Sequence, residues 1–373
     1  MIRTASHQAT HYRLSYRPPL CVAAILLFTL SACGITGNVK HYGKPLSKKD
    51  VMEAILSNPS SKALQMSGKD LSELALAKQN LEGAQLDHSS LRKANLRGTN
   101  LKHANLAATD LRNTNLRNAN LSGANLRGAD LSGANLSDAI LDGADLSGAI
   151  LDDTTLHRTS LQGVNLTGTS FIHAKLREMD FTGLVLRGIS FESTDMHETS
   201  FTRSDISETS FRKATLTQVK INQADASRAH FEKANLIKCD MSGTNLHQAI
   251  FKDAVLQNIQ LLGATLDEAN FSEADLMGSN LNLVSAVRTN FMWTYLTNAR
   301  LINANLSFAN LTNTTLRNAD LTKTNLSNAN LMHADLQGAR LELTNFKEAN
   351  VRGANMTDTN RKGAVNFNSV RGL

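Results

Sequence analysis

An apolar residue recurs at every fifth position over most of this chain. From Leu71 to Met356 it stands at nearly every position whose number ends in 1 or 6, without insertion or deletion, and only Ala226 and Ala286 are smaller. An α-helix needs apolar spacing of three and four, and an ordinary strand alternates by two. The spacing therefore predicts a five-residue repeat rather than either regular element.

Each repeat presents a small, a polar and a large apolar residue in that order, as in Ala94-Asn95-Leu96 and Ala129-Asp130-Leu131. Local alternation points the small and the large residue inward and the Asn or Asp outward. The two remaining positions are commonly Ser, Thr, Arg, Asn or Gly, which suits a turn. One unit is too short to bury its Leu, so successive turns must stack and share an interior.

This unit resembles the pentapeptide-repeat family over most of the chain. The resemblance implies an all-β solenoid, a right-handed four-sided parallel β-helix in which equivalent residues recur every 20. Residues 67–360 would supply about 14–15 coils, and a parallel spacing of about 4.8 Å per coil gives a rod roughly 70 Å long.

The 20-residue register also predicts columns of like side chains. One column, preceded by Leu151 and followed by Leu311, is aromatic, whereas the column that begins at Leu76 holds only Leu or Met up to Met356. The aromatic members are Phe171, Phe191, Phe211, Phe231, Phe251, Phe271 and Phe291. A ligand-binding stripe is one interpretation, but the register places the rings inside, which favours core packing.

Residues 46–66 are expected to form an N-terminal capping helix and a linker. Ser47 with Asp50 three residues later resembles a capping box, and Asn58-Pro59 would end the helix. One face of the helix is apolar, through Val51, Met52, Ile55 and Leu56. An open solenoid end exposes unpaired strand edges, so we assign the helix to covering that end. Membrane-surface binding through the two neighbouring lysines is the alternative.

Residues 1–32 have the features of a secretory signal. Basic residues without acids precede the apolar run 20–30, which is too short to span a membrane as an ordinary helix. The sequence Leu30-Ser31-Ala32-Cys33-Gly34 resembles the lipobox of bacterial lipoproteins. The resemblance implies lipidation of the Cys33 sulfur, cleavage before Cys33 and acylation of the new N-terminus. An uncleaved signal anchor is the alternative.

The lipobox resemblance also implies where the protein is located. Several acyl chains give stable anchoring to the lipid bilayer. Gly34 differs from the Asp that commonly retains such lipoproteins at the inner membrane, which favours the outer membrane of a bacterial envelope. Residues 33–45 would be a tether, and residues 361–373 a tail without a strong helix pattern. A homodimer through this C-terminal end is left open.

Net charge bears on the choice of partner. Family members that inhibit topoisomerases resemble duplex DNA through a strongly acidic rod, but this chain has a formal charge of +6. Without the three leader arginines, 36 of the 39 basic residues remain against 33 acidic ones. The near balance argues against DNA mimicry, and without a continuous basic stripe or interleaved aromatic residues we expect no nucleic acid partner.

Catalytic and metal-binding patterns are missing from the sequence. It contains neither a Gly-x-Ser-x-Gly elbow nor a His-Glu-x-x-His motif, and no paired Cys spacing. Cys239 falls at an inward small-residue position, where we expect a buried thiol in place of Ala. We therefore expect no enzyme activity, cofactor or metal site.

Several apolar residues stand at positions that should face water, around the coil 281–300 and its neighbours. A candidate partner-contact patch comprises Leu283, Val287, Met292, Trp293, Tyr295, Ile302 and Phe308. Clustered exposed aromatic residues and Met are typical of binding surfaces. The alternative is local variation, in which bulky side chains lie along the turns and are covered by neighbours.

These observations predict a non-enzymatic, membrane-anchored protein whose rod is a rigid scaffold or a surface for an unidentified protein partner. The alternative is a secreted or cytosolic inhibitor or effector, for example a topoisomerase-binding protein, that uses the faces of the rod.

Overall fold

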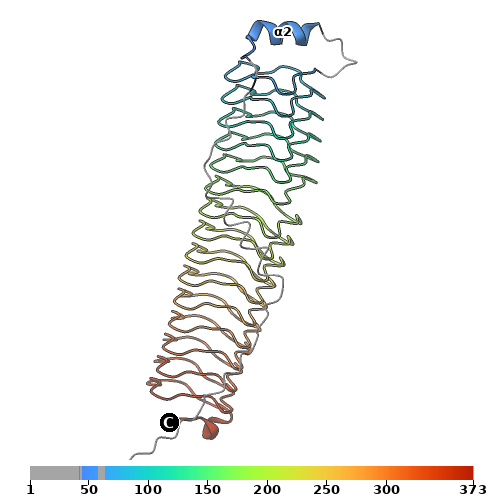
Figure 1. Cartoon of the computed structure of the whole chain (residues 1–373). Helices are drawn as coiled ribbons and strands as arrows, with labels where there is room; N and C mark the ends of the chain where they lie inside the picture. The colour runs from blue at the N-terminus through green and yellow to red at the C-terminus, as the bar shows by residue number, and fades with distance from the viewer. Residues whose placement is uncertain (1–41, 43, 58–63, 373) are drawn as a thin grey trace, which may run out of the picture. The chain divides into compact units, whose positions relative to one another are not determined.

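The structure is a computed structural model that describes residues 42, 44–57 and 64–372. These residues lie in the compact unit Tyr42–Leu373. Within it the chain winds into an elongated β-helix solenoid (Figure 1). Isolated parallel bridges pair residues 20 positions apart, beginning with Gln65 and Gln85, and four such ladders run side by side in steps of five residues. The 20-residue register expected from the sequence is therefore confirmed.

Each five-residue unit ends in a tight turn. The Ala94 N–H donates to the Leu91 carbonyl at 2.9 Å, and the same bond recurs from unit to unit. The third residue of every turn from Gly68 to Gly363 has a positive φ, as in Gln218 at 60°. A positive φ at this one turn position is the requirement of a type II turn.

The outward Asn or Asp of the unit stabilises both its own turn and the stack. Asn95 Oδ1 accepts the backbone N–H of Arg97 at 3.2 Å, which closes an Asx-type turn. Between coils, the Asn125 side-chain amide donates to Asn105 Oδ1 at 3.0 Å. These two roles explain why this position of the repeat is so often Asn or Asp.

The interior is filled by the large apolar column residues, most of them fully buried. The aromatic column stacks as expected, with ring centroids of Phe251 and Phe271 4.5 Å apart and nearly parallel. Phe181 and Phe201 form a second, shorter stack with edge contacts to the first. Core packing is therefore the correct interpretation of the Phe column.

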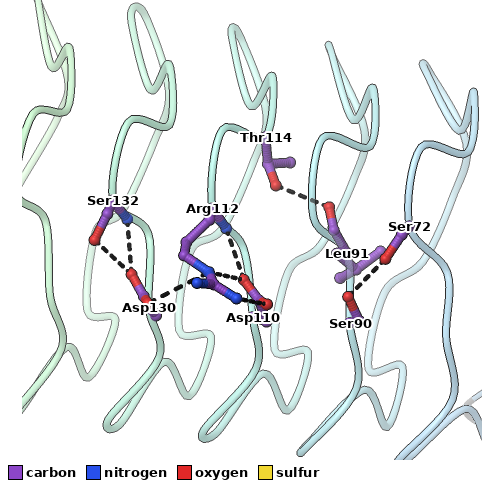
Figure 2. Close-up of polar contacts among 8 residues, drawn as sticks. All are labelled: Ser72, Ser90, Leu91, Asp110, Arg112, Thr114, Asp130 and Ser132. Carbon is purple, nitrogen blue, oxygen red and sulfur yellow. Dashed lines mark hydrogen bonds and ion pairs between the residues drawn. The ribbon is translucent and has the colours of Figure 1, made fainter. Parts of the chain in front are cut away.

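Buried Thr residues keep the interior free of unpaired hydroxyls. Thr114 Oγ1 donates to the Leu91 carbonyl of the preceding coil at 2.9 Å, as Figure 2 shows. Thr99 and Thr109 make the same bond 23 residues back. The small inward position therefore accepts Thr as readily as Ala.

One junction interrupts the ladders. Among residues 64–372, the expected rungs from Ser160 to Asp180 and from Asn165 to Val185 are missing, whereas the other two ladders continue past this level. The small inward position is unusually large here, because the chain carries Val164, Met179, Leu184 and Ile189. Single large residues at this position elsewhere, Val219 and Ile259, leave their rungs intact. We therefore attribute the separation of the coils on two sides to the four large residues that come together here, since overfilling an interior displaces backbone.

The N-terminal end is covered by α2, Lys48–Leu56. The predicted capping box is confirmed, since the Asp50 N–H donates to Ser47 Oγ and the Ser47 N–H donates to Asp50 Oδ2. Val51 is 1% exposed and joins the solenoid core, and the Leu46 N–H donates to the Asp70 carbonyl at 2.9 Å. The helix thus extends the core beyond the first coil.

The C-terminal segment folds back over part of the last coil. The 3-10 helix η2, Phe367–Ser369, places the Phe367 ring edge-on against Phe346 with centroids 5.3 Å apart. Arg371 then pairs with Asn350, 21 positions away, which ends the ladder out of register. The residues that cover this end thus lie in the segment for which the sequence pattern predicted no element.

Candidate interaction surfaces

Cys33, the predicted lipidation site, lies outside the described residues, as do the predicted signal peptide and most of the tether. No helix of the described part of the chain is both long enough and apolar enough to cross a membrane. Lipidation therefore stays a prediction from the lipobox.

The outward apolar residues differ in exposure. Four of them are about half exposed: Leu283 at 58%, Trp293 at 54%, Tyr295 at 53% and Phe308 at 52%. The other three members of the predicted patch, Val287, Met292 and Ile302, are partly buried. The patch residues are thus accessible in the described unit, most of all through their rings and Leu283.

The register separates these residues into strips on different turns. Leu283 and Ile302 lie on one turn of adjacent coils, where the Leu283 N–H donates to the Ile302 carbonyl at 3.0 Å. Val287 and Phe308 lie on the next turn around the coil. Met292, Trp293 and Tyr295 follow on the turn and ladder after that. The structure brings residues together within each strip, but it does not place all seven on one turn.

A polar cluster that sequence reasoning missed lies near the N-terminal end (Figure 2). The Arg112 guanidinium donates from Nε to Asp110 Oδ1 at 2.8 Å and from a terminal nitrogen to Asp110 Oδ2 at 2.5 Å. The same Nε lies 3.6 Å from Asp130 Oδ2 on the next coil. Arg112 therefore links two rungs of one ladder. The pattern Asp110-x-Arg112 was the available signal, but it does not reveal the burial that distinguishes this rung.

Tyr42 lies against the same cluster. Its hydroxyl is buried without a hydrogen-bond partner among the described residues. Burial raises the pKa of Tyr42, and the nearby Asp110 carboxylate raises it further. Ser90 and Asp110 are the only described outward rung residues that are buried, at 3% and 5% exposure. Tyr42 thus lies beside the rod at the level of the Asp110 rung.

Asp110 stays ionised in this setting. Burial alone would raise the pKa of Asp110, but the hydrogen bonds from the Arg112 side chain and backbone outweigh burial and lower the pKa. The cluster therefore consists of a satisfied ion pair with an aromatic cover, and it has the character of a packing contact rather than a catalytic site.

Alternating charges along the middle of the rod also satisfy one another. Arg212 donates to Glu232 Oε1 at 2.8 Å, Lys213 donates to Glu192 Oε1 at 3.1 Å, and Lys252 lies 3.3 Å from Glu273 Oε1. Exposed pairs of this kind contribute about 0–1 kcal/mol each. Their main effect is to pair opposite charges on neighbouring coils, which helps to hold the coils in register.

Among the described residues, we looked for a reactive thiol, a metal site and a pocket. Cys239 is fully buried, its Sγ lies 2.6 Å from the Leu216 carbonyl, and burial raises the pKa of the thiol to about 12. Within residues 64–372 and the short segment before them, no group of three or more His, Cys, Asp or Glu could hold a metal ion. A shallow depression of about 340 Å³ near the C-terminal end is lined by Arg317, Asn318, Gln337, Gly338 and Asp358. Arg317 is already paired with Asp335.

The geometry defines a repeat protein whose interior is filled by buried side chains and whose outer surface is long. The model of the pentapeptide repeats matches residues 70–282 and 289–360 in overlapping segments. The chain therefore belongs to the pentapeptide-repeat family, and this membership implies a right-handed β-helix.

Solved structures of other pentapeptide-repeat proteins are similar to parts of the chain. Rfr23 from Cyanothece 51142 is 42% identical over 24% of this chain and 62% of its own, with a TM-score of 0.24. HetL from Nostoc sp. strain PCC 7120, involved in heterocyst differentiation regulation, is 24% identical over 87% and 97%, with a TM-score of 0.21. QnrB1, a plasmid-mediated fluoroquinolone resistance protein, is 19% identical over 53% and 89%, with a TM-score of 0.23. A search of curated proteins found no match.

Proposed function

We propose that this chain is a non-enzymatic lipoprotein of the bacterial envelope, anchored through acylated Cys33, more favourably in the outer than in the inner membrane. Its four-sided rod of about 14–15 coils serves as a rigid scaffold or protein-interaction surface.

The long stack of coils, without an inserted loop, is the observation that carries the scaffold function. Apart from Ala226 and Ala286, every five-residue unit from Leu71 to Val351 buries a large residue in the core, and polar rung residues bond to their own turns and to the next coil. In a solenoid built this way each coil contacts only its neighbours, and the stack presents an extended surface. We therefore expect the protein to act by binding a partner along this surface and by holding that partner at the membrane.

The anchor rests on the sequence around Cys33 and is tested by metabolic labelling. Cells that express the full chain are fed a palmitate analogue, and the protein is recovered and assayed for label. We expect labelled wild-type protein and unlabelled Cys33→Ser protein. A Cys33→Ser protein that carries as much label as wild type would overturn the assignment, whereas Cys239→Ser is a matched control that should keep the label.

The inhibitor-type alternative is tested separately. The balanced charge, and the pairing of residues such as Arg212 with Glu232, give this rod little of the acidic surface that DNA mimicry needs. We expect no inhibition of gyrase by the purified protein at physiological salt, and clear inhibition would favour the alternative. Self-association through the C-terminal end is measured in the same preparation by sedimentation, with Met356→Asp as the variant, because Met356 lies partly exposed on the last coil.

A further inference from the structure

One side of the rod combines the point where the described chain begins with a distal area that is almost without charge. We define this side as the ladder of outward residues from Asp70 to Asn350 in steps of 20, together with the turns before and after each rung. The parallel bridges of this ladder are continuous, and they also cross the level at which two other ladders are interrupted. We call it the Tyr42 side, because Tyr42 lies against its Asp110 rung.

The distal part of the Tyr42 side is almost without charge. It consists of the segments 287–293, 307–313 and 327–333, which stack on three successive coils. The rungs are Asn290, Asn310 and Asn330, joined in part by Asn side-chain bonds such as Asn310 Nδ2 to Asn290 Oδ1 at 3.2 Å. Arg288 is the only Lys, Arg, Asp or Glu in the three segments, and its guanidinium lies over the Phe308 ring, 5.4 Å from the centroid.

Large apolar side chains rise from both edges of this neutral area. Phe308 lies on the turn before the Asn310 rung, and Trp293 lies on the turn after the Asn290 rung. Each side chain is about half exposed. Both occupy the left-handed turn position, with φ of 60° and 61°. Val287, Met292 and Met332 flank them and are partly buried. Neutral amides bordered by Trp, Phe and Met suit an interface in which charges would be desolvated.

We infer that the Tyr42 side faces a lipid bilayer, and that Trp293 and Phe308 insert at the headgroup level. The inference rests on the proposed lipid anchor. The described chain begins at Tyr42 beside the Asp110 rung, and Tyr42 is only nine positions after Cys33. At no more than about 3.6 Å per residue the tether reaches roughly 32 Å, so an acylated Cys33 holds this part of the rod near the membrane.

A second contact on the same side then determines the orientation of the rod. The Asn290 rung lies nine coils beyond Asp110, or roughly 43 Å along the axis. An anchor at one end alone would leave the rod free to stand upright. A second, aromatic contact on the same side holds it along the surface, and Trp is well suited because its ring is apolar and its N–H remains near water.

Trp293 is the only Trp of the chain and therefore reports on this contact directly. The full lipidated protein is mixed with vesicles of phosphatidylethanolamine and phosphatidylglycerol, and tryptophan emission is recorded with and without lipids brominated on the acyl chains. We expect emission at shorter wavelength on vesicle binding and quenching by bromine. Vesicle-bound protein whose emission is unchanged would overturn the inference, as would a shift that depends on protein concentration without vesicles, which would point to a second copy.

Matched variants test whether the contact is specific to the Tyr42 side. Phe308→Ser removes the second ring of the surface and should weaken the vesicle-dependent shift, whereas Leu343→Ser removes a side chain of similar exposure, 51%, from a different turn and should leave the shift unchanged. Equal effects of the two variants would contradict the assignment of a side. If Cys33 carries no palmitate label but the emission shift occurs, the proposed lipid anchor is wrong and the membrane-facing surface is supported. If Cys33 is labelled and the emission shift is absent, the anchor is supported and only the assignment of the Tyr42 side to the membrane is wrong.

Discussion

At the residue scale, the left-handed turn position is the strongest constraint that the repeat imposes. From Gly68 to Gly363 the third turn residue always has a positive φ, and in many units it is Lys, Glu, Asn or Gln rather than Gly. Val, Ile and Thr never occur there. A β-branched side chain at positive φ is a genuine outlier because Cβ crowds the backbone. The solenoid thus tolerates a small cost at each turn but avoids the residues for which that cost is largest.

A pair of adjacent substitutions tests this constraint. Gln218 has φ 60° and an exposed side chain, and Thr217 precedes it in the same turn without positive φ. We expect Gln218→Val to lower the free energy of unfolding by about 1 kcal/mol, because the second branch at Cβ adds to the crowding that Gln218 already has. Thr217→Val, which is nearly isosteric, should change it by less than about 0.5 kcal/mol. Urea denaturation of both variants measures the difference, and equal values would show that the turn is not strained.

Cys239 gives a second residue-scale prediction. Because the thiol is fully buried and its pKa is raised to about 12, it carries almost no thiolate at neutral pH. We expect maleimide at pH 7 to label Cys239 only after unfolding in urea. Cys239→Thr should retain native stability better than Cys239→Asp, since Thr residues at equivalent positions donate to the same carbonyl of the preceding coil. Rapid labelling of the folded protein would contradict the buried position.

At the element scale, the aromatic column contributes through continuous stacking. Phe251 lies between Phe231 and Phe271, with centroid separations of 4.7 Å and 4.5 Å. Phe251→Ala should lower the free energy of unfolding by about 3–5 kcal/mol, because neighbouring coils cannot collapse into the space. Phe251→Leu should cost less than about 1.5 kcal/mol, as Leu fills the same column elsewhere. The two denaturation midpoints check this, and similar losses would show that ring stacking rather than volume dominates.

The sequence predicted the column residues, their 20-residue register and the capping box of α2, because each depends on local spacing and on one repeated environment. It did not predict the cover of the Asp110 rung by Tyr42, since that contact joins residues far apart outside the repeat. It also missed η2, because Phe367 packs on Phe346 through an edge contact in a segment without periodicity. The outward apolar residues could be found in the sequence, but their division among turns required the register to be followed around the coil.

At the scale of the whole molecule, stability in a solenoid is a sum over neighbouring coils, so its weakest junction governs where it opens. That junction lies where the rungs from Ser160 to Asp180 and from Asn165 to Val185 are missing. The core is also less well sealed here, because Leu161 and Leu166 are 4% and 3% exposed whereas most column residues along the rod are fully buried. Of the two interrupted ladders, one lies opposite the Tyr42 ladder and the other lies next to it, whereas the Tyr42 ladder itself is intact at this level.

We therefore expect amide exchange to be fastest in the middle of the rod rather than only at its ends. Peptides that cover residues 160–168 and 180–188 should exchange sooner than the equivalent peptides 120–128 and 220–228 in a hydrogen-exchange mass spectrometry experiment. The double variant Val164→Ala with Leu184→Ala should slow exchange at the junction, because removing the excess inward volume lets the coils approach and the rungs form. The matched double variant Ala124→Val with Ala144→Leu, at the equivalent positions two coils earlier, should create a new fast-exchanging junction if volume is the cause. Unchanged exchange in both double variants would show that overfilling does not separate these coils.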